Sequence, residues 1–302
     1  MIFLYRSSPW LRLLRPQTMA ATVALYLLPA AVVHDPWSSQ FLVWGIIGVL
    51  MHLFGFVSNE LFDRHHDARR QYLQHKPLVA RPQMATAATA IVLAALVAIF
   101  VLAVTMFTPV VTVLIIGATL AAFAYNALSK VTPVWGPSLL AAWGALSVLA
   151  VASSGEWPKG IAPASMLVVY TTLAILYQVN LGFLKDPGEA PERRVLVTLD
   201  VLAIGMMLVA AYATTTLLTY PAIALTLLIS VIGTRGGLYL HANRPAALRM
   251  MALHEFGGYL TAVCLVLPAL RWQEAAALAI VPVVWYLVVN RMVYGAAMTP
   301  GV

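Results

Sequence analysis

Long apolar stretches alternate with short polar connections along most of the 302-residue chain. A helix that crosses a bilayer needs about 20 apolar residues, so each such stretch is a candidate membrane span. The candidates cover residues 18–34, 41–58, 84–105, 109–126, 136–153, 163–184, 195–217, 219–234, 252–270 and 274–291. The pattern predicts an all-α membrane protein, a polytopic bundle of nine to ten transmembrane helices, in which 274–291 is a possible extra helix.

Composition supports the membrane interpretation and excludes some chemistry. Hydrophobic residues make up 62% of the chain and charged residues 10%, whereas a soluble domain has roughly a quarter charged residues. The single cysteine, Cys264, lies in an apolar run, so neither a disulfide framework nor a cysteine-based metal site can form. We interpret the net charge of +7 as membrane topology, with the lipid bilayer as partner and no nucleic acid.

The distribution of basic residues predicts the orientation. If the N-terminus is cytoplasmic, all of the 18 Lys and Arg residues except Lys159 and Arg271 fall on the cytoplasmic side. This bias is the usual signature of cytoplasmic loops. Two inner loops, 59–83 and 185–195, are dense in both signs of charge. The sequence therefore predicts a multi-pass protein whose active site faces the cytoplasm.

The two charged loops occupy equivalent places in the chain. Each follows the second helix of a set of four predicted helices, with Asp63 in the first loop and Asp186 in the second. Such a weak internal duplication predicts two four-helix-like repeats around a central cavity, within a single domain over residues 1–302.

The first charged loop begins with a regular polar spacing. Because four residues advance a helix by about 400°, Asn59, Asp63 and Asp67 form one stripe that drifts about 40° per step. Carboxylates at the mouth of a bundle suit Mg²⁺, which prefers a few protein oxygens together with phosphate oxygens, so a diphosphate ligand is implied. The alternative interpretation is a solvated helix end whose acids pair with nearby arginines, namely Arg64, Arg69 and Arg70.

The second charged loop repeats this composition. Its acidic residues Asp186, Glu189 and Glu192 are bracketed by Lys185, Arg193 and Arg194. Two acidic clusters with neighbouring bases can hold two phosphates through bridging metal and direct ion pairs. The pairing of the loops favours the diphosphate interpretation over the solvated helix end.

Several segments together resemble the UbiA superfamily of membrane prenyltransferases. The spacing Asn59-x3-Asp63-x3-Asp67, followed by Lys76-Pro77-Leu78-Val79, is similar to the first signature of that family. Further similarities, over about residues 12–270, are Leu14-Arg15-Pro16 before the first span, the pair Tyr125 and Lys130, and Lys185-Asp186 with Arg193-Arg194. The second signature departs from the family, whose aspartates are four apart, because position 190 is alanine.

The resemblance implies Mg²⁺-assisted ionisation of a prenyl diphosphate to an allylic cation, which an unidentified small or lipid acceptor then attacks. Implied catalytic residues are Asp63, Asp67, Asp186 and Lys130. Implied metal ligands are Asn59, Asp63, Asp67, Asp186 and, more weakly, Glu189. Implied substrate-binding residues are Asn59, Arg15, Lys76, Arg81, Tyr125, Asn180, Lys185, Arg193 and Arg194.

Two other functions use similar sequence features. A terpene cyclase on the same scaffold would ionise the same diphosphate, so the sequence discriminates poorly between cyclase and transferase. A secondary transporter could also show duplicated bundles with acidic residues, although transporter sites usually lie near the bilayer midplane. Acceptor identity and prenyl chain length stay open. The intramembrane His52 is predicted to serve helix packing or hydrogen bonding.

Overall fold

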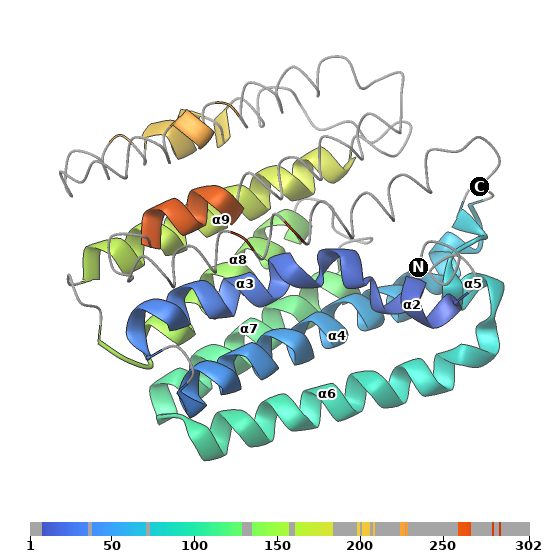
Figure 1. Ribbon diagram of the computed structural model, residues 1–302. Helices are drawn as coiled ribbons and strands as arrows, with labels where there is room; N and C mark the ends of the chain where they lie inside the picture. Colours follow the sequence, from blue (N-terminus) through green and yellow to red (C-terminus); the bar gives the residue numbers. More distant parts are fainter. Residues whose placement is uncertain are drawn as a thin grey trace.

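The described part of the protein is helical, and it contains no strand. The computed structural model describes residues 8–35, 38–70, 73–128, 135–156 and 161–183, with short pieces at 198–199, 201–205, 208, 224–226, 228, 259–266, 280 and 284. The elements are α2 (Pro9–Leu14), α3 (Pro16–Val33), α4 (Ser39–Asp67), α5 (Pro77–Ala80), η2 (Pro82–Met84), α6 (Ala85–Met106), α7 (Pro109–Leu128), α8 (Trp135–Ala152) and α9 (Ile161–Phe183) (Figure 1).

Six long helices coincide with the first six predicted spans. Helices α4, α7, α8 and α6 with its leading turn η2 are each long and apolar enough to cross a membrane. Helices α3 and α9 contain the shorter apolar stretches Thr18–Val33 and Met166–Tyr177. The four later spans predicted from 195 onward lie largely outside the described residues, so a total of nine to ten remains a prediction.

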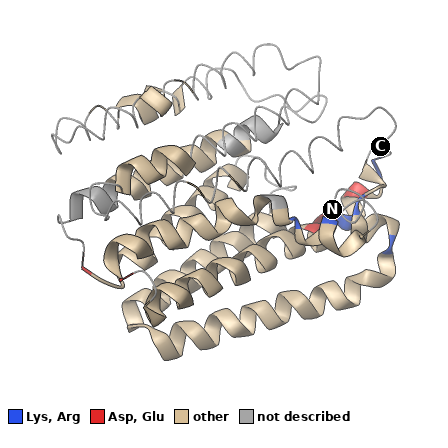
Figure 2. Ribbon diagram, in the orientation of Figure 1, with Lys and Arg blue, Asp and Glu red and all other residues tan. Residues whose placement is uncertain are grey.

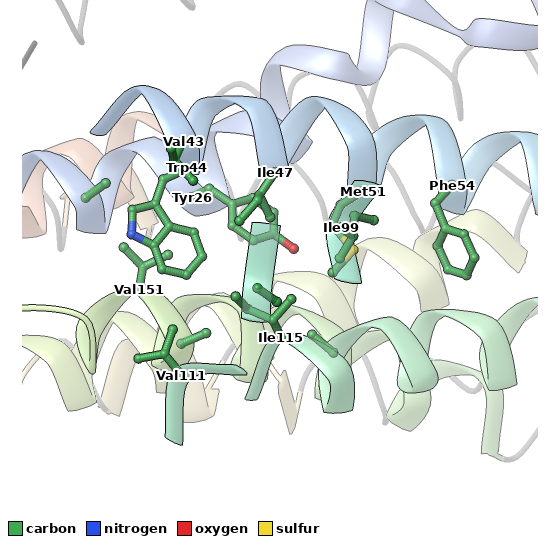
Figure 3. Packing of buried hydrophobic residues seen from close by; sticks show 14 of the residues in the cluster. Tyr26, Val43, Trp44, Ile47, Met51, Phe54, Ile99, Val111, Ile115 and Val151 are labelled. Carbon is green, nitrogen blue, oxygen red and sulfur yellow. The ribbon is translucent and has the colours of Figure 1, made fainter. Parts of the chain in front are cut away.

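Helix α4 is the centre of the described bundle and packs against α3, α6 and α7, while α8 packs against α7 and α9. Its inward face carries Trp44, Ile47, Met51 and Phe54, all of them fully or almost fully buried. Figure 3 shows these side chains interleaved with residues of the surrounding helices. Because lipid is as apolar as these side chains, close packing rather than escape from water holds such helices together.

Glycine at position 48 lets α3 approach α4 closely. A Cβ at this position would lie 3.1 Å from the Cα of Val23 and 3.2 Å from Cδ2 of Tyr26. Such spacing is typical of membrane helices whose backbones approach through small residues. The α3–α4 contact matters for the site because it fixes the N-terminal end of α3 beside the C-terminal half of α4 (Figure 1).

Helix α4 extends well past its apolar stretch. It has 29 residues, or about 44 Å at 1.5 Å per residue, whereas the hydrocarbon core of a bilayer is about 30 Å thick. The predicted span 41–58 therefore continues as one helix through Asp67, and the first charged loop begins only after that residue. The acidic motif thus lies on a rigid helix.

Candidate functional site

Charged residues of the described part of the chain gather at the end of the bundle where α4 meets α2 and α5 (Figure 2). The remainder of these long helices is almost free of charge within the described residues. Acidic and basic residues are therefore present together at a single end of an apolar bundle.

Three carboxylates on α4 point into the protein. Glu60, Asp63 and Asp67 are 2%, 3% and 1% exposed. Their spacing of i, i+3 and i+7 places them within about 60° of one another on the helix surface. Asn59, which is only partly buried, donates from Nδ2 to Oδ2 of Asp63 at 3.2 Å. The predicted grouping of Asn59 with the two aspartates is thus present, and its buried face also includes Glu60.

Lys76 connects two of these carboxylates to the following turn. Its Nζ lies 2.6 Å from Oδ2 of Asp67 and 3.6 Å from Oε1 of Glu60. The residue is the N-cap of α5, where Pro77 at the first helical position presets the backbone. Leu78 in the next turn is buried in a small apolar cluster with Leu13 of α2. This packing positions the lysine above the acidic face.

Arg15 contacts the Glu60 carboxylate from the N-terminal part of the chain. It separates α2 from α3, and its Nη2 forms an ion pair with Oε1 of Glu60. Its Cζ lies 5.5 Å from the ring centroid of Phe56, one turn earlier on α4. The backbone of Arg15 is left-handed, with φ 45°. A non-glycine residue in this conformation costs on the order of 1–3 kcal/mol and persists only where the surroundings hold it.

His52 provides part of that support. Its side chain is fully buried. Because a carbonyl oxygen can only accept, Nε2 must donate to the Leu14 carbonyl at 2.9 Å, which leaves Nδ1 to accept from the Thr22 hydroxyl at 3.2 Å. The Leu14 carbonyl directly precedes Arg15, and Thr22 lies farther along in α3. The prediction that His52 serves packing and hydrogen bonding is confirmed.

Helix α7 closes the site from another side. The phenol of Tyr125 lies within electrostatic range of the Asp63 carboxylate and the Arg15 guanidinium. The adjacent Asn126 is buried and donates from Nδ2 to the Gly55 carbonyl at 2.9 Å and to Oγ of Ser58 at 2.6 Å. These bonds fix α7 against α4 immediately before the acidic face. Tyr125 is therefore placed beside the predicted metal ligands.

Some predicted site residues are not part of this group. Arg81 is exposed at the C-cap of α5, and the ion-pair network of Glu60 and Asp67 does not include it. Asn180 belongs to α9, but its side chain is not described. Six further predicted residues lie outside the described residues, namely Lys130, Lys185, Asp186, Glu189, Arg193 and Arg194. Convergence of the two charged loops therefore remains a prediction.

Burial bears on one of the two interpretations of the first acidic motif, the solvated helix end. A solvated helix end would leave its acids exposed, yet Asp63 and Asp67 are almost fully buried. Buried carboxylates need compensation by partners, and Asp67 receives it from Lys76. Burial therefore contradicts the solvated helix end, and buried charges of this kind serve either a structural pairing or a ligand.

The carboxylate oxygens of this site suit a hard divalent cation that is also coordinated by oxygens of a bound ligand. Within the described residues, no group of three or more His, Cys, Asp or Glu side chains could hold a metal ion by itself. Mg²⁺, however, commonly uses only one or two carboxylates and completes its shell with phosphate oxygens and water. Asp63 and Asp67, one helical turn apart and both buried, meet that requirement.

Sequence reasoning overlooked Glu60. A stripe of every fourth residue from Asn59 passes over position 60. The alternative spacing of three and then four residues, from Glu60 to Asp63 to Asp67, was available in the sequence and gives a tighter helix face. This spacing is enough to place Glu60 on the acidic helix face. The ion pairs of Glu60 with Arg15 and Lys76 depend on the tertiary structure.

Comparison with known proteins agrees with this architecture. Several solved structures of a UbiA homologue from Archaeoglobus fulgidus are similar to the chain. The form bound to DMAPP and Mg²⁺ has a TM-score of 0.61 at 18% identity, over 84% of this chain and 99% of that chain. The form bound to GPP and Mg²⁺ has a TM-score of 0.58 at 18% identity with the same coverage.

The sequence itself also identifies the family. No curated protein matches the chain. The pattern of the UbiA prenyltransferase family, however, matches residues 18–256, which is most of the chain and includes the whole acidic face of α4. The all-helical fold, the apolar helices and the resemblance of the motifs point the same way. The chain therefore belongs to the UbiA prenyltransferase family.

Proposed function

We propose that the protein is an integral membrane enzyme that transfers a prenyl group from a prenyl diphosphate to a small or lipid acceptor. The observation that carries the proposal is the buried carboxylate pair Asp63 and Asp67, flanked by Lys76 and Arg15, at the end of an apolar helix bundle. A prenyl diphosphate has matching parts, because its head is anionic and its tail is apolar. Family membership and the fold support this proposal.

The carboxylates of Asp63 and Asp67 would hold Mg²⁺, and Asn59 orients Asp63 through its amide. When bound, Mg²⁺ would act as a Lewis acid and neutralise the charge of the departing diphosphate. The similar Archaeoglobus proteins were solved with Mg²⁺ together with DMAPP or GPP, which are prenyl diphosphates. Lys76 and Arg15 add fixed positive charge beside the carboxylates, where the leaving group would develop negative charge.

The second half of the site follows from the sequence. Asp186, with Glu189 as a weaker ligand, would complete metal binding from the second charged loop. The proposed phosphate contacts from outside the ion-pair network are Lys130, Lys185, Arg81, Arg193 and Arg194. Tyr125 and Asn180 would line the pocket. The excess of basic residues on one predicted side of the membrane supports a cytoplasmic site.

The apolar bundle would protect the reactive intermediate. Loss of diphosphate from an allylic substrate leaves a carbocation, which water would capture quickly. A cavity between apolar helices excludes water and holds an electron-rich acceptor near the cation, so a new carbon–carbon or carbon–oxygen bond forms instead. The proton or other electrofuge of the acceptor then leaves to complete the transfer.

The test uses purified full-length protein in vesicles, labelled prenyl diphosphates of several chain lengths, and a lipid extract as the source of acceptors. We expect labelled prenyl products by mass spectrometry, together with release of diphosphate that stops with EDTA and returns with Mg²⁺. A cyclic hydrocarbon formed from prenyl diphosphate alone would overturn the transferase proposal in favour of a cyclase. Uptake of a solute without Mg²⁺-dependent diphosphate release would favour a transporter.

A further inference from the structure

Glu60 pairs with cations from two separate segments of the chain. Its side chain is 3% exposed, and its Oε1 contacts both Nη2 of Arg15 and Nζ of Lys76. Arg15 lies 45 residues before it, at the α2–α3 turn. Lys76 follows it in the turn before α5. One buried carboxylate therefore joins three segments of the chain.

These contacts give Glu60 a different chemistry from the neighbouring aspartates. A carboxylate that already receives two cations has little remaining charge to offer a metal ion. Asp63 receives an amide hydrogen bond from Asn59. Asp67 contacts Lys76, which it shares with Glu60, and lies 3.6 Å from Nδ1 of the adjacent His66. When Mg²⁺ takes up the charge of Asp67, Lys76 would still be held by Glu60.

The conformation of Arg15 indicates that the position of its side chain is specified. A left-handed residue directly before a proline is unfavourable, because the proline ring restricts the preceding backbone. The turn is nevertheless held by the Glu60 ion pair, by the ring of Phe56 and by the hydrogen bond from His52 to the Leu14 carbonyl. Strained conformations held in this way are concentrated at functional sites.

From this geometry we propose that Glu60 is a positioning residue, which fixes Arg15 and Lys76 so that both cations face the diphosphate of the substrate. The inference deepens the proposed function and rests on it. Arg15 and Lys76 bind the phosphate oxygens directly, whereas Glu60 acts through them. Without Glu60, the turn at Arg15 relaxes, and Lys76 keeps only its contact with Asp67.

The decisive test is whether the affinity for diphosphate rises or falls when Glu60 is replaced. Glu60→Gln removes one negative charge from the site, so electrostatics alone would strengthen the binding of an anion. Loss of positioning would weaken it. With inorganic diphosphate and Mg²⁺ as the probe, we expect the affinity of Glu60→Gln to fall by about tenfold or more, because disrupting a buried charge pair has effects of this size. Glu60→Asp, which keeps the charge, should restore part of the affinity.

A second measurement separates positioning from metal ligation. Mn²⁺ binding, followed by electron paramagnetic resonance in place of Mg²⁺, should fall far less in Glu60→Gln than in Asp63→Asn. In an Arg15→Met/Lys76→Met background, Glu60→Gln should produce little further loss of diphosphate affinity, because the groups through which it acts are gone. Glu156→Gln, at an exposed position after α8, is the matched control and should change nothing.

Each outcome either supports or overturns the inference. Unchanged or tighter diphosphate binding by Glu60→Gln, in protein that elutes as folded wild type does, would overturn it. So would a loss of Mn²⁺ binding as complete as in Asp63→Asn, because Glu60 would then be a metal ligand. If the wild-type protein itself bound no diphosphate, the proposed function would be wrong. Arg15 and Lys76 would then have no diphosphate ligand for Glu60 to position them against.

Discussion

Nζ of Lys76 lies 2.6 Å from Oδ2 of Asp67, nine residues earlier in the chain, and this carboxylate is almost completely buried. The lysine occupies a position from which it neutralises the acid that we propose as a metal ligand. Metal and lysine would therefore compete for the charge of Asp67, whereas lysine and substrate phosphate attract each other. Lys76 should consequently have opposite effects on the two ligands.

Replacement of Lys76 by Met should strengthen metal binding and weaken diphosphate binding. Removing a positive charge within a few ångströms of the carboxylates should tighten Mn²⁺ binding by about tenfold or more at an effective dielectric constant of 20. Lys76→Arg, which keeps the charge, should stay close to wild type for the metal. Titration of Mn²⁺ by electron paramagnetic resonance checks the effect, and weaker metal binding in Lys76→Met would show that the lysine does not compete.

Asp63→Asn and Asp67→Asn should each remove nearly all prenyl transfer while the protein remains folded and inserted. An amide preserves the shape of the side chain but cannot carry the charge that holds the metal, so turnover should fall at least about 100-fold. The assay is product formation in vesicles, with size-exclusion elution as the check on folding. Full activity in both variants would remove the metal assignment.

His52→Phe should destabilise the protein. The substitution leaves the Leu14 carbonyl without its buried donor, which typically costs about 1–3 kcal/mol. His65→Phe on the same helix is the control, because His65 is exposed and should tolerate the change. Thermal unfolding in detergent measures both variants. Equal midpoints for the two variants would mean that the turn before α3 does not need His52.

Gly48→Ala and Gly55→Ala should differ although both lie on α4. A methyl group at position 48 would press on the backbone of α3, with Val23 Cα at 3.1 Å, and such overpacking typically costs about 1–3 kcal/mol. At position 55 nothing lies within 4 Å of the new Cβ, so the higher helix propensity of alanine should stabilise by up to about 1 kcal/mol. Thermal unfolding of the two variants should therefore shift in opposite directions. If Gly48→Ala were as stable as wild type, the α3–α4 contact would be looser than it is in this structure.

The spans in the first half of the chain could be predicted closely from hydropathy. The stretches 18–34, 84–105 and 109–126 correspond to α3, α6 and α7 with small shifts at their ends. A membrane helix needs a continuous apolar run, and this requirement is local, so it can be read from composition alone. The end of α4 could not be read in this way, because polar residues continue its helix beyond the lipid.

The sequence by itself determined that the chain is a helical membrane protein with two acidic motifs, and that Asn59, Asp63 and Asp67 share one helix face. Only the tertiary structure decided that the face with Glu60 is buried, that Lys76 pairs with Asp67, and that Arg15 reaches Glu60 from a left-handed turn. The physical reason is the distance along the sequence over which each kind of contact acts. Helix formation and side-chain spacing follow from neighbours within a few residues, whereas the partners of a buried charge come from segments that meet only when the helices pack.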